Sequence, residues 1–137
     1  ETEYGTVGLA VCRDRHYTDV IRSLARQGAG LVLVPVDDDF NGNSRFPYFG
    51  ASDSVFRAVE NRVSIVTGTT SGISQIISPY GEMISSGSVN ERGFIAAETF
   101  TAEKQSLYST FGDWFGMLTV ILFVFFLTAS RKAKKDR

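Results

Sequence analysis

The chain has 137 residues and a formal net charge of −1, which hides an uneven distribution. Residues 131–137 hold five of the fourteen basic residues and one of the fifteen acidic residues, so residues 1–130 carry a net charge of −5. An acidic body lacks the basic face that neutralises phosphates, which argues against a nucleic acid as partner. The single cysteine, Cys12, excludes an intrachain disulfide. The first residue is Glu1, and we expect the chain to be a piece of a longer protein.

The first predicted strand ends at the cysteine. Val7, Leu9 and Val11 alternate with other residues, which is typical of a buried strand. Cys12 follows directly and opens a polar stretch. A thiol at this point lies at the carboxyl end of a strand, where open α/β sheets place their chemistry. The alternative is an inert core cysteine, because a free thiol packs as a small hydrophobe.

The next two segments predict a helix and a second strand. Residues 17–27 place apolar side chains at helical spacing, and Gly28 ends that pattern. Residues 31–36 form a continuous apolar run, which is typical of a strand covered on both faces. The order strand, helix, strand predicts a right-handed βαβ unit with two parallel strands.

Residues 37–50 predict a long polar and aromatic loop at the same edge of the sheet as Cys12. The loop begins with Asp37, Asp38 and Asp39, which resemble the start of a calcium loop. The spacing of an EF-hand and its closing glutamate are missing. We therefore interpret the aspartates as solvated loop residues and predict no metal and no cofactor.

A second helix and several short strands are predicted after this loop. Ser52 or Asp53 caps the helix, which runs to about Arg62. Its apolar stripe consists of Val55, Phe56, Val59 and Val63. Arg57 and Glu60 are three residues apart and near enough to pair; a catalytic role for Glu60 is the alternative. The strands expected afterwards are residues 63–67, 72–78, 83–85 and 93–99.

The second strong feature lies near the end of the chain. Residues 115–130 contain no charged side chain and precede a basic cluster. They would span roughly 24 Å as a helix, a little under the ~30 Å hydrocarbon core of a bilayer. We predict a transmembrane helix at 114–130, after a juxtamembrane linker at 102–113. By the positive-inside rule, residues 131–137 form a cytoplasmic tail on the cell membrane, and the folded body lies outside the cytoplasm. A buried core helix is the alternative.

Five short motifs stand out in chain order. They are Gly8–Asp14, Gly30–Pro35, Phe56–Asn61, Gly72–Ser74 and Pro79–Gly81. In order and spacing they resemble the carboxyl-terminal half of the carbon-nitrogen hydrolase, or nitrilase, superfamily. The stretch Ser106–Phe115, which leads straight into the apolar segment, is similar to the apolipoprotein N-acyltransferase family within it. The resemblance covers roughly residues 5–130.

This resemblance implies an α/β fold, namely the carboxyl-terminal half of a four-layer α-β-β-α sandwich at residues 1–101, followed by one transmembrane helix. It also implies a triad of glutamate, lysine and cysteine. Cys12 matches the nucleophile, and the backbone N–H of Arg13 matches the oxyanion donor. The supporting residues expected around them are Asp14, Arg57 and Glu60. The family's glutamate and lysine lie upstream of the cysteine, and no residue of this chain matches them.

Three functions follow as expectations. The favoured one is the nucleophile-bearing part of a membrane N-acyltransferase, which moves a fatty acyl group from a phospholipid to the amino-terminal cysteine of a lipoprotein through a Cys12 thioester. Its partners would be those substrates, the membrane and the missing amino-terminal half of the catalytic domain. The alternatives are a membrane-tethered amidase or nitrilase, and a non-catalytic anchored module that binds a partner through residues 37–50. A Cys12–His16 dyad is a further candidate for activating the thiol.

Overall fold

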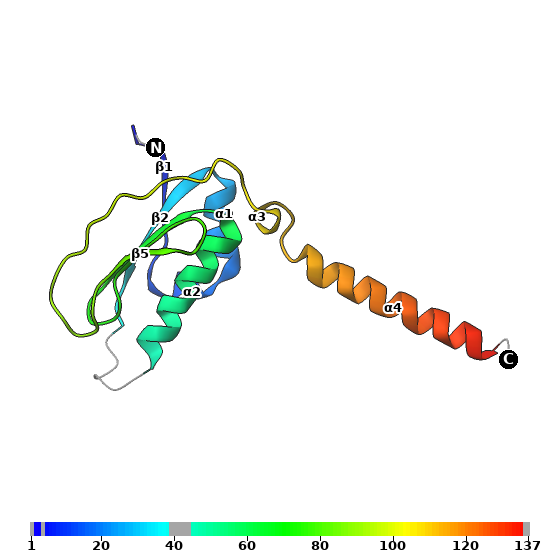
Figure 1. Ribbon diagram of the computed structural model, residues 1–137. Helices are drawn as coiled ribbons and strands as arrows, with labels where there is room; N and C mark the ends of the chain where they lie inside the picture. The colour runs from blue at the N-terminus through cyan, green and yellow to red at the C-terminus, as the bar shows by residue number, and fades with distance from the viewer. Residues whose placement is uncertain (1, 4, 39–44, 136–137) are drawn as a thin grey trace.

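The computed structural model describes residues 2–3, 5–38 and 45–135, which form a mixed sheet of five strands, two helices on one of its faces and a long projecting helix (Figure 1). The elements are, in order, β1 (Thr6–Leu9), the 3-10 helix η1 (Cys12–His16), α1 (Thr18–Arg26), β2 (Ala29–Val36), α2 (Phe46–Asn61), β3 (Ser64–Thr69), β4 (Gln75–Ile77), β5 (Met83–Ser86), α3 (Leu107–Phe111) and α4 (Trp114–Lys135). The strands lie in the order β1-β2-β3-β4-β5. β1, β2 and β3 are parallel, and β4 and β5 continue the sheet antiparallel. The predicted parallel pairing of the first two strands is confirmed.

The core lies between the sheet and the helices α1 and α2. Its buried side chains include Ile21, Ala25, Val32, Val34, Val36, Ala58, Ile65 and Ile77. On β2, every second residue points toward the helices, because successive side chains of a strand alternate between its faces. At β1 the helix approaches closely, since a Cβ on Gly8 would contact the Leu24 side chain.

The other face of the sheet is open. Val7, Leu9 and Val11 are 36%, 64% and 54% exposed, and Leu33, which pairs with Leu9, is 39% exposed. The expectation that the first strand is buried is therefore wrong, as is the expectation that the second is covered on both faces. The physical reason is that α1 packs against Gly8 on the small-residue side of β1, which directs the large apolar side chains to the opposite face.

Helix α2 begins earlier than predicted. It starts at Phe46, with Pro47 in its first turn, so the last five residues of the expected loop are helical. Proline suits a first turn, where its missing N–H would have no helical acceptor. The caps predicted at Ser52 and Asp53 are wrong, because both residues lie inside the helix. The part of the predicted loop at 39–44 lies outside the described residues.

The face that α2 buries is small and polar. Its buried residues include Ala51, Ser54, Arg57, Ala58 and Asn61. Phe56 and Val59, both predicted on a buried stripe, are exposed. Small side chains let the helix lie close to the sheet, and the larger apolar ones are left on its outer side.

The later strands agree with the prediction only in part. β3 and β5 correspond to the strands predicted at 63–67 and 83–85. The strand predicted at 72–78 is reduced to β4, because its first residues belong to the bend after β3. Residues 93–99 form no strand in the structure.

The segment before the apolar helix is folded onto the body. Arg22 of α1 donates hydrogen bonds from Nε to the carbonyls of Tyr108 and Ser109, at 3.1 Å each, and from a terminal nitrogen to that of Thr110, at 3.2 Å. Ser106 caps α3 and also donates to a carbonyl of α2. The predicted linker therefore contains a helix fastened to both α1 and α2.

Helix α4 projects away from the body (Figure 1). Residues 114–132 are long and apolar enough to cross a membrane, with a mean hydropathy of 1.7 and none of the stretch buried. The alternative of a buried core helix is therefore wrong for this segment.

Candidate functional site

Cys12 lies on a sharp turn between β1 and η1. The N–H of Ala10 still bonds the carbonyl of Leu33 on β2, at 3.0 Å, and the chain leaves the sheet after that. Cys12 then adopts a φ of +53°, in the left-handed region that residues other than glycine rarely occupy. Such strain gathers at functional sites, and nucleophiles are often presented on strained strand-to-helix turns. The thiol is free and half-buried at the edge of the core.

Asp14 holds this turn closed. Its carboxylate accepts a hydrogen bond from the N–H of Val11 at 2.8 Å, and its own N–H donates to the carbonyl of Val11 at 3.0 Å. These reciprocal bonds span Cys12 and Arg13. The N–H of Arg13 belongs to the first turn of η1, where backbone donors have no acceptor within the helix. The predicted candidates Cys12, Arg13 and Asp14 are thus brought together.

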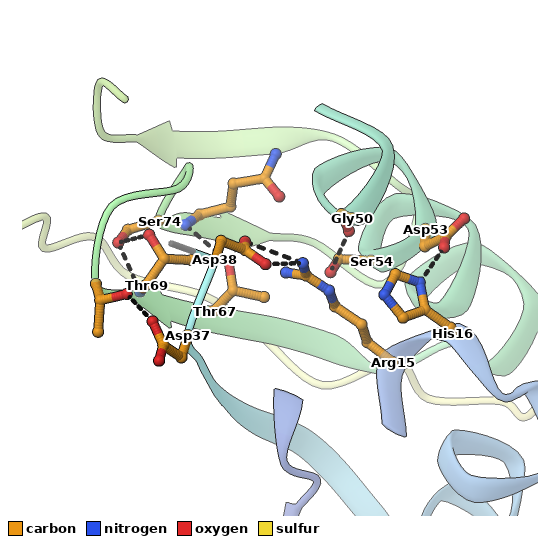
Figure 2. A network of polar contacts seen from close by, with 12 residues as sticks. Arg15, His16, Asp37, Asp38, Gly50, Asp53, Ser54, Thr67, Thr69 and Ser74 are labelled. Atoms are coloured by element: carbon orange, nitrogen blue, oxygen red, sulfur yellow. Dashed lines mark hydrogen bonds and ion pairs between the residues drawn. The ribbon is translucent and has the colours of Figure 1, made fainter. Parts of the chain in front are cut away.

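Beneath this turn lies a buried ion pair that the sequence did not reveal. Arg15 and Asp38 are 1% and 5% exposed, and one terminal nitrogen of Arg15 lies 2.8 Å and 3.0 Å from the two carboxylate oxygens of Asp38 (Figure 2). Arg15 comes from η1, and Asp38 follows the end of β2. The pair therefore ties the Cys12 turn to the neighbouring strand. The prediction that Asp38 is a solvated loop residue is wrong.

Two glycines make room for this pair. A Cβ at Gly50 of α2 would collide with the Arg15 guanidinium, and one at Gly72 would collide with the Asp38 carboxylate. Asp37, next to Asp38 in the chain, accepts a hydrogen bond from the Thr70 hydroxyl at 2.6 Å. Asp37 and Asp38, the two described aspartates of the stretch that resembles a calcium loop, thus accept hydrogen bonds from other side chains of the protein.

His16 is oriented by α2. Its Nδ1 lies 2.5 Å from a carboxylate oxygen of Asp53 (Figure 2). The residue considered as a partner for Cys12 is thus engaged by a carboxylate from a different element. This contact fastens η1 to the amino-terminal half of α2, whereas Arg15 joins η1 to Asp38 after β2.

Arg57 and Glu60 lie at the other end of the sheet. α2 runs from the end of β2 back to the start of β3, so its last turn is opposite the edge that carries Cys12. The two side chains form the expected pair, with a hydrogen bond of 2.9 Å. Burial raises the pKa of the Glu60 carboxyl, and the Arg57 guanidinium opposes that shift. The structure does not bring these two residues to the Cys12 turn.

The sequence contained a signal for the ion pair between Arg15 and Asp38, but that signal was ambiguous. Arg15 lies within the polar stretch after Cys12, and Asp38 follows the adjacent parallel strand. Parallel strands bring their carboxyl ends to one edge, so the two residues share an edge by topology. Their burial depends on Gly50 and Gly72, which only the folded chain places against them.

Relatives among curated proteins match most of the chain. An apolipoprotein N-acyltransferase from Geobacter metallireducens is 32% identical over 120 residues, covering 88% of this chain and 23% of that protein. One from Gloeobacter violaceus is 28% identical over 131 residues, covering 96% of this chain and 25% of that protein. The chain thus spans about a quarter of the length of these relatives.

Solved structures share the fold. A carbon-nitrogen hydrolase from Helicobacter pylori matches with a TM-score of 0.60 at 20% identity, over 66% of this chain and 39% of that one. An amidase from Nesterenkonia matches with a TM-score of 0.53 at 24% identity, over 68% and 40%. The mixed sheet with its two helices therefore resembles part of the nitrilase fold.

The family model named carbon-nitrogen hydrolase matches residues 1–106, which include the Cys12 turn, the buried ion pair and all five strands. The chain belongs to the carbon-nitrogen hydrolase, or nitrilase, superfamily, and its distant relatives include proteins named apolipoprotein N-acyltransferase.

Proposed function

We propose that this chain is the nucleophile-bearing part of a membrane N-acyltransferase, in which Cys12 carries a fatty acyl group from a phospholipid to the amino-terminal cysteine of a lipoprotein. The observation that carries the proposal is the strained turn at Cys12, which lies at the carboxyl end of a parallel strand in a relative of apolipoprotein N-acyltransferases. The same edge is braced by Asp14, Arg15 and Asp38.

The reaction divides into two acyl transfers. In the first, the Cys12 thiolate attacks the ester carbonyl of the donor, a C–S bond replaces the C–O bond, and the departing lysophospholipid oxygen takes a proton. In the second, the acceptor amine attacks the thioester, a C–N bond replaces the C–S bond, and the proton lost from nitrogen returns to the thiolate. The N–H of Arg13 is the donor nearest in sequence for the oxyanion of both steps. The general base and the lysine are assigned to chain outside these 137 residues.

The open face of the sheet supports the proposal that a further part of the catalytic domain packs against this chain. Val7, Leu9, Val11 and Leu33 form an apolar surface, and a soluble domain rarely leaves such a surface in water. A second sheet packed there would bury these side chains and complete an α-β-β-α sandwich. We propose that this second sheet carries the glutamate and lysine of the triad.

Helix α4 suits substrates that cannot leave the bilayer. Exposing an acyl chain to water costs about 0.8 kcal/mol per CH₂ group, so an enzyme that acts on such chains gains from staying at the membrane. By the positive-inside rule, the basic residues after the helix support a cytoplasmic tail and a folded body on the opposite side of the cell membrane.

A second candidate is a membrane-tethered amidase that releases its acyl group to water. It is favoured by the likeness to the Nesterenkonia amidase, one structure of which carries a covalent acetamide adduct at its active site cysteine. Incubation with a phospholipid and a diacylated lipopeptide separates the two functions. The acyltransferase yields a triacylated peptide, whereas the amidase yields free acid.

The test uses the complete protein that contains this chain. We expect acyl-radiolabelled phospholipid to leave label at position 12 that neutral hydroxylamine removes, because hydroxylamine cleaves thioesters. Cys12→Ser is the sharpest variant, since an oxyester at that position would resist hydroxylamine. Arg26→Ala, which removes an exposed side chain at the end of α1 far from the Cys12 turn, serves as the control. An active protein in which Cys12→Ala leaves acyl transfer unchanged would overturn the proposal and favour a non-catalytic anchored module.

A further inference from the structure

A hollow of about 540 Å³ lies beside the juxtamembrane segment, at the end of the sheet opposite Cys12. The last turn of α2 forms one side of it, and residues 104–108, just before and within α3, form the other. α4 begins three residues after α3 ends. The hollow is therefore held close to the start of the predicted transmembrane helix.

Two cations in its lining have no carboxylate partner. Arg62 and Lys104 form no ion pair in the part of the chain that the structure describes. The one carboxylate in the lining, Glu60, is already paired with Arg57 at 2.9 Å. The hollow thus keeps an excess of positive charge, in a body that is acidic elsewhere.

Aromatic and apolar groups complete the lining. Arg62 lies 4.7 Å from the centre of the Tyr80 ring, which orients its guanidinium. Tyr108 lies on the other side of the hollow, and Leu107 beside it is exposed. Tyrosine, with an apolar ring and a polar tip, is enriched where a protein meets the interface of a bilayer.

The juxtamembrane side of the hollow is held in place by the body. The three hydrogen bonds from Arg22 fix the carbonyls at 108–110, and the Ser106 hydroxyl donates to the Glu60 carbonyl. The backbone at 106–110 is therefore held in place beside the last turn of α2. A guanidinium, an ammonium and phenol hydroxyls together are donors that suit phosphate oxygens.

We infer that this hollow binds the phosphate headgroup of an anionic phospholipid from the leaflet next to the body, through Arg62 and Lys104. The site is separate from Cys12 and does not depend on acyl transfer. It would anchor the body at a defined height and rotation above the membrane.

The test uses the full chain in detergent micelles, titrated with phosphatidylglycerol and read out by native mass spectrometry. Each cation would donate a charge-assisted hydrogen bond to the phosphate, worth about tenfold in affinity, so the double variant R62Q/K104Q should bind roughly a hundredfold more weakly than wild type. Arg26→Gln is the matched control, because it removes the same charge from an exposed position at the same end of the body. It should leave binding unchanged.

Two further arms complete the experiment. Phosphatidylcholine, whose headgroup has no net charge, should bind as weakly to wild type as phosphatidylglycerol binds to the double variant. Competition by inorganic phosphate at micromolar concentration would indicate a soluble phosphate ligand and overturn the assignment to lipid. If wild type and R62Q/K104Q bind phosphatidylglycerol equally well and melt at the same temperature by circular dichroism, Arg62 and Lys104 do not form a lipid site. Cys12→Ala should bind normally, which separates this inference from the proposed acyl transfer.

Discussion

The edge that carries Cys12 and the edge that faces α3 are built from different contacts. At the Cys12 edge, η1 is held by the ion pair between Arg15 and Asp38, which is almost wholly removed from water. At the α3 edge, Arg22 binds backbone carbonyls from a partly exposed position. A buried pair tolerates little displacement, because separating its charges leaves one of them uncompensated. The comparison indicates that the Cys12 turn is the more rigid end, whereas the segment at the α3 end can detach at a smaller cost in free energy.

Gly50→Ala is expected to have the largest effect, and it probes the rigid end. Alanine in a helix interior is normally more stable than glycine by roughly 0.5–1 kcal/mol. Here the new methyl group would clash with the guanidinium of Arg15, which is buried. We expect a loss of about 3 kcal/mol or more in the free energy of unfolding, measured by chemical denaturation, together with altered alkylation of Cys12.

Gly93→Ala is the control for this substitution, because its Cβ would meet no atom within 4 Å. If Gly50→Ala is as stable as wild type and Cys12 reacts at an unchanged rate, the buried pair does not brace the turn. The conclusion that the Cys12 end is more rigid than the α3 end would then be wrong.

Arg22→Ala is expected to have an intermediate effect, confined to the α3 end. It removes three charge-assisted hydrogen bonds to carbonyls of 108–110 and the ring contact with Tyr108. We expect a loss of about 2 kcal/mol and faster tryptic cleavage after Lys104, with the alkylation rate of Cys12 unchanged. Arg26→Ala should change neither quantity. A change in Cys12 alkylation with Arg22→Ala would show that the two ends are coupled.

Glu60→Gln is expected to have the smallest effect, visible as a change in pH dependence. Burial raises the pKa of Glu60 in the folded state above its ordinary value of 4.5, so the folded state binds the proton more tightly than the unfolded state. This group's contribution to stability is therefore fully present below its unfolded pKa and is lost as the pH rises through its folded pKa. Melting of wild type and variant from pH 4 to 8 should show wild type losing stability relative to Glu60→Gln with rising pH. A difference that is constant across this range would contradict the assigned direction.

Several features could be predicted from the sequence because they depend on local pattern. The alternation around Val7 to Val11, the helix at 17–27 and the apolar run at 31–36 are sufficient for a parallel βαβ unit. The apolar segment after Trp114 is long enough to define its own helix. The motif around Cys12 indicated the family, which residues 1–106 then matched.

Other features were decided by tertiary packing. Which face of β1 is buried depends on how closely α1 approaches Gly8, and local periodicity is the same for either face. The start of α2 depends on Pro47 in a first turn, where the sequence also permits a loop. Side chains that are large and apolar were predicted to be inside, yet Phe56 lies outside because a small-residue face lets the helix pack closer.

Cys12 could be proposed as the candidate nucleophile from the sequence alone, since it lies in a motif that resembles the carbon-nitrogen hydrolase superfamily. Its left-handed turn, the pair of Arg15 with Asp38 and the separation of Glu60 from the site were determined only by the tertiary structure. The reason is physical: burial and ion pairing depend on the space between elements. That space is set by residues such as Gly50, which lie far from the cysteine in the chain and close to it in the fold.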